Sequence, residues 1–93
     1  MIYHFKKGVM LVKFQTIKQD IKQGMNLEYF FTYYKYEVTV NVMRETIFYS
    51  FRSKDGECCT FMLPKDDYME MKYKEFLNIV HQHLYYNCEE VIE

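Results

Sequence analysis

Hydrophobic residues near the start of the chain recur every three to four positions, which is the period of an amphipathic helix. Lysine and glutamine occupy the opposite side, and Gly24 is a residue type that commonly ends a helix. We therefore expect a helix at about residues 10–24, preceded by a short strand at Ile2–Phe5. The hydrophobic stripe of this helix consists of Met10, Phe14, Ile17, Ile21 and Met25.

From Leu27 to Arg44 the pattern changes to a period of two, as in a half-buried strand. The run is longer than a usual strand of about 5–6 residues, so we expect a bend or bulge near Tyr33–Lys35. Thr46–Arg52 and Glu57–Leu63 alternate in the same way. Between them, Asp55-Gly56 accommodates a positive φ at low cost, which favours a hairpin.

After Pro64 the helical period returns, and Asp67 with Glu70 three positions later fits a capping box. Because neither helix can bury its stripe alone, both must cover one face of the sheet. The chain is therefore expected to be one α+β domain, residues 1–93: a three-stranded antiparallel sheet (four-stranded if Ile2–Phe5 joins it) flanked by an N-terminal and a C-terminal helix. The stripe of the second helix consists of Met69, Tyr73, Phe76, Leu77, Val80, Leu84, Cys88 and Val91.

Large side chains dominate the composition: ten Tyr, eight Phe and seven Met, against three Gly and one Pro. A chain that is 49% hydrophobic is not expected to be disordered. Three cysteines, two of them adjacent, do not resemble a disulfide framework, which favours a reducing, cytoplasmic compartment. The scarcity of residues with GC-rich codons indicates an AT-rich coding sequence, such as that of a low-GC bacterium, its phages or some viruses.

The net charge of -1 argues against bulk electrostatic attraction to nucleic acid or to a membrane. The charge is nevertheless uneven. Residues 1–35 carry six lysines and two acidic residues, a net +4, whereas residues 36–93 have a net charge of -5. This asymmetry favours either self-complementary packing or one face that meets a charged partner.

The outer side of the last helix combines large hydrophobic or aromatic groups with carboxylates. Such groups on a face turned away from the core are typical of a protein interface. The alternative is that this helix is buried on two sides, between the sheet and the first helix. The predicted interface consists of Met71, Ile79, Tyr85, Tyr86, Glu70, Glu75, Glu89, Glu90 and Glu93.

The run Tyr29–Tyr36 has six aromatic residues out of eight. Aromatic rings next to a lysine can stack the bases of single-stranded nucleic acid, and Tyr29, Tyr33 and Lys35 would form such a face. A strand buried on one face would have the same composition, so core packing is the competing interpretation.

No catalytic or cofactor motif is present, and we expect no enzymatic activity, no catalytic residue and no cofactor. His81 and His83 are two positions apart on a helix and point in nearly opposite directions, so they cannot bind one metal ion together. No metal site is expected.

These patterns favour a small module that binds another protein, and specifically a stoichiometric inhibitor of a host nucleic-acid enzyme or defence nuclease. Its acidic, tyrosine-bearing surface would dock on a basic nucleic-acid-binding groove. In architecture alone, a helix, a strand meander and a helix of this size are similar to phage proteins that block host defence nucleases, among them anti-CRISPR proteins. The alternatives are a single-stranded nucleic-acid-binding domain and a homo-oligomeric structural protein.

Overall fold

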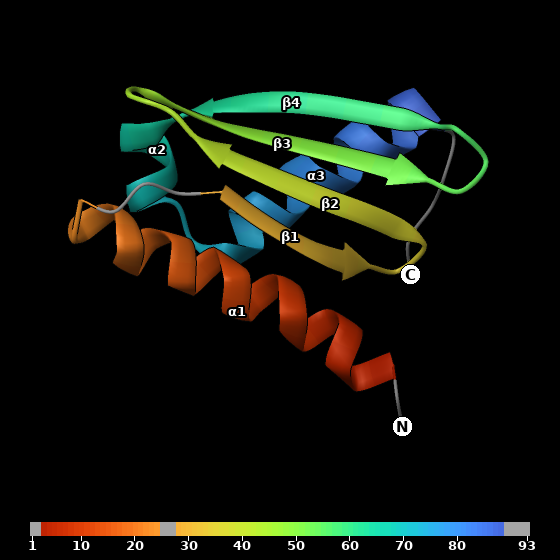
Figure 1. The fold of residues 1–93 in the computed structure, drawn as a ribbon, viewed down its shortest axis with the longest axis horizontal. Helices are drawn as coiled ribbons and strands as arrows, with labels where there is room; N and C mark the ends of the chain where they lie inside the picture. Colours follow the sequence, from red (N-terminus) through yellow and green to blue (C-terminus); the bar gives the residue numbers. More distant parts are fainter. Residues whose placement is uncertain (1–2, 25–27, 89–93) are drawn as a thin grey trace.

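A computed structural model of the chain describes residues 3–24 and 28–88 (Figure 1). Along the chain, one helix precedes four strands and a pair of helices follows them, which confirms the predicted α+β class. The elements are α1 (Tyr3–Lys22), β1 (Glu28–Tyr33), β2 (Tyr36–Val42), β3 (Thr46–Ser53), β4 (Cys58–Pro64), α2 (Lys65–Glu70) and α3 (Tyr73–Cys88).

The sheet is antiparallel with the order β1-β2-β3-β4, so each strand pairs with its neighbour in the chain. The bend expected near Tyr33–Lys35 is a complete reversal, because Tyr33 pairs with Tyr36 across a two-residue turn. Tyr34, the first residue of this turn, has a φ of 55°, a left-handed conformation that is uncommon for a residue other than glycine. The long alternating run is therefore two strands, and it supplies the fourth strand of the sheet.

The short N-terminal strand expected at Ile2–Phe5 is wrong for Tyr3–Phe5, which form the first turn of α1; Ile2 lies outside the described residues. The hydrophobic residues of this segment, Ile2, Tyr3 and Phe5, are too few to distinguish the period of a strand from that of a helix. Once the stripe that follows has formed a helix, extending it by a turn costs little compared with starting a new element. The helix continues through Gly8.

The last helix is interrupted, whereas the sequence predicts a continuous one. Met71 has an extended backbone with a ψ of 142°, which ends α2 and separates it from α3. The capping box predicted for Asp67 and Glu70 is wrong: Pro64 occupies the N-cap of α2 and its side chain makes no hydrogen bond. The break lets Tyr68 become fully buried although it lies outside the predicted stripe.

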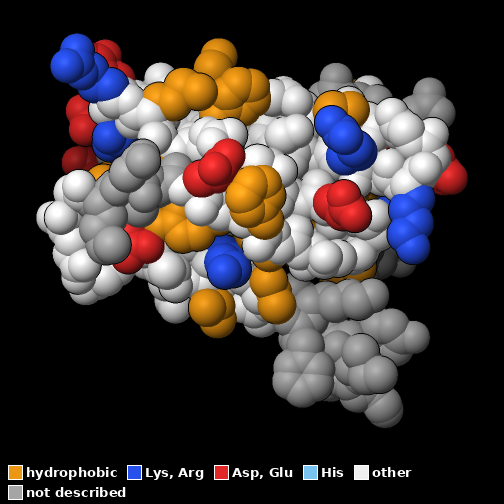
Figure 2. Space-filling model, in the orientation of Figure 1, with side chains coloured by type: hydrophobic (Ala, Val, Ile, Leu, Met, Phe, Trp, Pro, Cys, Tyr) orange, Lys and Arg blue, Asp and Glu red, His pale blue; other side chains and the backbone are white. Residues whose placement is uncertain are grey.

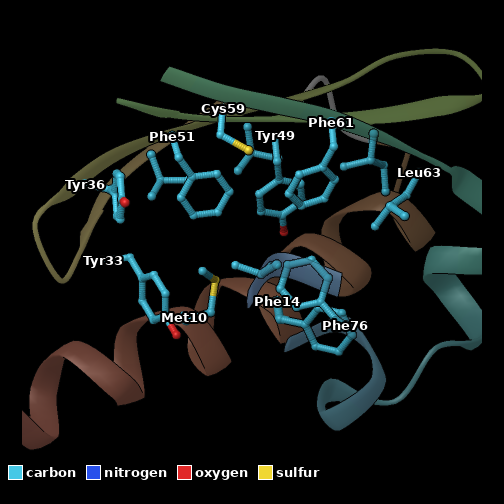
Figure 3. Packing of buried hydrophobic residues seen from close by; sticks show 14 of the residues in the cluster. Met10, Phe14, Tyr33, Tyr36, Tyr49, Phe51, Cys59, Phe61, Leu63 and Phe76 are labelled. Atoms are coloured by element: carbon cyan, nitrogen blue, oxygen red, sulfur yellow. The ribbon is translucent and has the colours of Figure 1, made fainter. Parts of the chain in front are cut away.

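Helices cover one face of the sheet, with α3 behind it and α1 along β1, while the other face is open (Figure 1). In the core between the two layers, eight of the seventeen buried hydrophobic residues that the structure describes are aromatic (Figure 3). Phe14 of α1 stacks on Phe76 of α3 with ring centroids 4.8 Å apart, and Tyr49 of β3 lies 5.1 Å from Phe76. These rings connect both helices to the centre of the sheet.

The hydroxyl groups of Tyr49 and Tyr68 form a buried hydrogen bond of 2.8 Å that joins β3 to α2. Replacing Tyr68 with phenylalanine leaves the Tyr49 hydroxyl buried without this partner, so we expect a loss of about 1–3 kcal/mol in unfolding free energy. The double variant Tyr49→Phe/Tyr68→Phe should lose less than the two single variants combined. Urea unfolding of all four proteins measures this coupling, and additive losses would contradict it.

Candidate protein-binding surface

A shallow hollow of about 390 Å³ lies where α2 meets α3. We call it the acidic hollow; its lining residues are Asp67, Glu70, Met71, Glu75 and Ile79. The side chains of Met71 and Ile79 are half-buried and pack against the core, while the three acidic residues are exposed. The break between the helices creates this arrangement, because it brings the end of α2 beside the first turns of α3.

Hydrogen bonds between side chains and backbone groups fix the segment that forms the acidic hollow. The backbone N–H of Lys72 donates a hydrogen bond of 2.9 Å to Oε1 of Glu75, so Glu75 caps the start of α3. The ammonium group of Lys18, on α1, donates to the carbonyl oxygen of Met71 and lies 4.3 Å above the ring centroid of Phe14. The irregular segment between the helices is thereby tied to both α1 and α3.

Burial lowers the pKa of Lys18, and repulsion from Lys22 acts in the same direction. Attraction to Glu75 raises that pKa, so Lys18 lies within electrostatic reach of one carboxylate of the acidic hollow. None of the residues that line the hollow is cationic. The arrangement therefore presents an apolar floor and a negatively charged rim to a visiting group.

The structure brings together four residues of the predicted interface, Glu70, Met71, Glu75 and Ile79. Asp67 lines the same hollow, although it is not among the predicted interface residues. It lies about two turns before Glu75 on the predicted continuous helix, which places both on one side and is the signal that could have identified it. Glu89, Glu90 and Glu93 lie outside the described residues.

Tyr85 and Tyr86 are 53% and 77% exposed, with ring centroids 5.2 Å apart. They follow Ile79 by six and seven residues, which on a helix is about 9–10 Å along the axis. They therefore form a separate aromatic site at the end of α3.

The residues predicted to stack nucleic-acid bases do not form one exposed face. Tyr33 is only 2% exposed, and its hydroxyl lies 3.1 Å from Nε2 of His81 within the structure. Tyr29 is half-buried and donates a 2.5 Å hydrogen bond to Asp20, whereas Lys35 is exposed and pairs with Glu57 at 3.5 Å. The reason is the alternation of β1, which turns Tyr29 and Tyr33 towards the helices.

The histidines and cysteines whose side chains the structure describes, His81, His83, Cys58 and Cys59, do not form one cluster. Burial lowers the pKa of His81, and the ring of His83 stacks on Phe61 with centroids 4.4 Å apart. Cys58 is exposed and Cys59 is buried. Within residues 3–24 and 28–88, no three His, Cys, Asp or Glu side chains gather in a way that would hold a metal ion.

The open face of the sheet carries hydrophobic side chains that the sequence analysis did not single out (Figure 2). Phe30 and Met62 are 66% and 62% exposed, and Phe48 is half-buried. Phe48 pairs with Met62 across β3 and β4. Phe48 alternates with the core residues Ile47 and Tyr49 along β3, so its side chain is on the other face of the sheet. The period-two pattern of the sequence could therefore have predicted its place on the open face.

None of the helices in the described part of the chain has the length and hydrophobicity needed to cross a membrane. Comparison of the chain with protein-family models, curated proteins and solved structures finds no match.

Proposed function

We propose that this protein is a small binding module whose acidic hollow holds a basic, partly apolar segment of another protein. The observation that carries this proposal is the gathering of three carboxylates around the half-buried side chains of Met71 and Ile79. A lysine or arginine side chain suits such a site, because its apolar stem covers the floor while its charged end reaches the carboxylates.

The proposal extends to inhibition of a nucleic-acid enzyme. Such enzymes bind phosphates through basic grooves, and a protein with an acidic docking site can occupy that groove in place of the nucleic acid. The scarcity of residues with GC-rich codons supports a phage or another mobile element as the source, and the protein would then act in the host cytoplasm. No step of this role requires a catalytic residue in the chain.

The double variant Glu70→Gln/Glu75→Gln tests the acidic hollow. Glutamine removes both charges and keeps a side-chain oxygen that can cap the N–H of Lys72. The probe is a fluorescently labelled helical peptide rich in lysine and leucine, and binding is followed by fluorescence anisotropy. We expect the double variant to bind about tenfold more weakly than the wild type, which corresponds to about 1.4 kcal/mol, and wild-type binding to weaken with added salt.

The matched control is Glu37→Gln, which removes an exposed carboxylate on β2, away from the hollow. It should bind the peptide as the wild type does. Equal loss in the control, or binding that does not change with salt, would refute a specific role for the hollow. For the inhibitory role, a nucleic-acid enzyme should be enriched from host cells by the wild type and lost with the double variant.

A further inference from the structure

β4 is an edge of the sheet, and no strand in the described ranges pairs with its outer side. Its pairing with β3 is continuous and has no bulge: it runs from Cys58, which pairs with Arg52, to Pro64, which pairs with Thr46. It is also the one strand of these four without a charged residue; the others contain Glu28, Glu37 and Arg52. Edge strands usually carry charges, prolines or bulges that prevent pairing with another chain. In β4 such a residue stands only at the last position, Pro64, so Cys58–Leu63 is left open to such pairing.

The backbone groups that point to this open edge follow from two hydrogen bonds. The N–H of Ser53 donates to the carbonyl oxygen of Glu57, and the N–H of Lys65 donates to that of Glu45, each at 2.9 Å. These bonds lie at the two ends of the β3–β4 ladder, and bonded pairs alternate with unbonded pairs in antiparallel strands. The residues whose N–H and C=O groups point outward are therefore Cys58, Thr60 and Met62.

We propose that β4 pairs antiparallel with β4 of a second copy of this chain, which joins the two sheets across a two-fold axis. The register with Phe61 on the axis overlaps all seven residues of the strand. In that register Glu57, just before β4, lies opposite Lys65 of the other copy, just after it, and the pair occurs twice. Opposite charges across paired strands stabilise the pairing, and β4 itself brings no like charges together.

The end of α3 provides further contact area for this pairing. Two seven-residue strands bury less than the roughly 1,200–2,000 Å² of a stable interface. The last turns of α3 lie behind β4 (Figure 1), and Tyr85 and Tyr86 on them are exposed. These rings can pack against the second copy beside the paired strands. The pairing uses no residue of the acidic hollow, so it stands or falls separately from the proposed function.

The substitution Thr60→Lys tests the pairing. It places a charge near the middle of β4, on a residue whose backbone groups point to the open edge. The matched control is Thr39→Lys, on the same open face but on the central strand β2. Size-exclusion chromatography with light scattering should give the wild type and Thr39→Lys twice the 11.5 kDa of one chain. Thr60→Lys should give the mass of one chain, with an unchanged circular dichroism spectrum.

If Thr60→Lys does not fold, Met62→Lys takes its place, because the Met62 side chain is already mostly exposed. A wild type with the mass of one chain up to millimolar concentration would overturn the proposal. Dissociation of the Thr39→Lys control would also overturn it, since the open faces rather than the edges would then form the contact. So would a folded β4 variant that keeps twice the mass of one chain.

Discussion

Replacing Phe76 with alanine is expected to lower the unfolding free energy by about 3–5 kcal/mol, the usual cost of removing a fully buried phenylalanine. Phe76 is 0% exposed, and its ring lies within 4.8–5.7 Å of the rings of Phe14, Tyr49 and Tyr68. These neighbours come from α1, β3 and α2, so the cavity would weaken the contact of each with α3. Urea unfolding followed by circular dichroism measures the loss.

The matched control for this prediction is Phe30→Ala, which removes the same side chain from the open face of β1, where it is mostly exposed. We expect a change within about 0.5 kcal/mol, as for surface substitutions away from special features. A similar loss in both variants would mean that Phe76 does not occupy the centre of the core.

Raising the pH above 10 is expected to destabilise the folded protein steeply. Burial raises the pKa of Tyr49 and of Tyr68, whereas a tyrosine in the unfolded chain titrates near pH 10. Above that pH the unfolded state loses both protons and the folded state retains them. The unfolding free energy should therefore fall by roughly 2.7 kcal/mol per pH unit from these two residues together.

Unfolding in urea at a series of pH values from 8 upward measures this slope, with stability present below about pH 10 and lost as the pH rises. Burial also raises the pKa of Tyr33, which adds to the same trend. The control is the Tyr49→Phe/Tyr68→Phe variant, whose slope should be shallower by two protons. Parallel slopes for the two proteins would contradict the assignment.

The sheet is the part of the fold that the sequence predicts well. Period-two alternation marks Thr46–Arg52 and the core residues Cys59, Phe61 and Leu63, and the Asp55-Gly56 turn is a hairpin as expected. The reason is that burying one face of a strand leaves a direct record in the order of residues. The same alternation explains the burial of Tyr33, once β1 is known to end at that residue.

The sequence predicts a bend near Tyr33–Lys35 but not that it is a full reversal. It does not predict the break of the last helix at Met71, where a contact distant in the chain is present. Tyr34 adopts its left-handed φ without glycine, so no local preference announces the reversal between β1 and β2. Met71 interrupts the last helix without a proline or glycine nearby, and its carbonyl oxygen is bonded by Lys18, far away in the chain.

The candidate site is predictable only in part for the same reason. Helical spacing selects Met71 and Ile79 as outward-facing, but the hollow they line requires the break between α2 and α3. A continuous helix would have spread Glu70, Glu75 and Ile79 along one rod.

The sequential order of the strands has a consequence for how quickly the chain folds. The loops between successive strands contain two, three and four residues, so each pairing closes only a short loop and loses little chain entropy. Domains dominated by such local contacts fold faster than those whose strands pair across long separations. The distant contact between Phe14 and Phe76 can then form on a sheet that has already brought the two ends of the domain together.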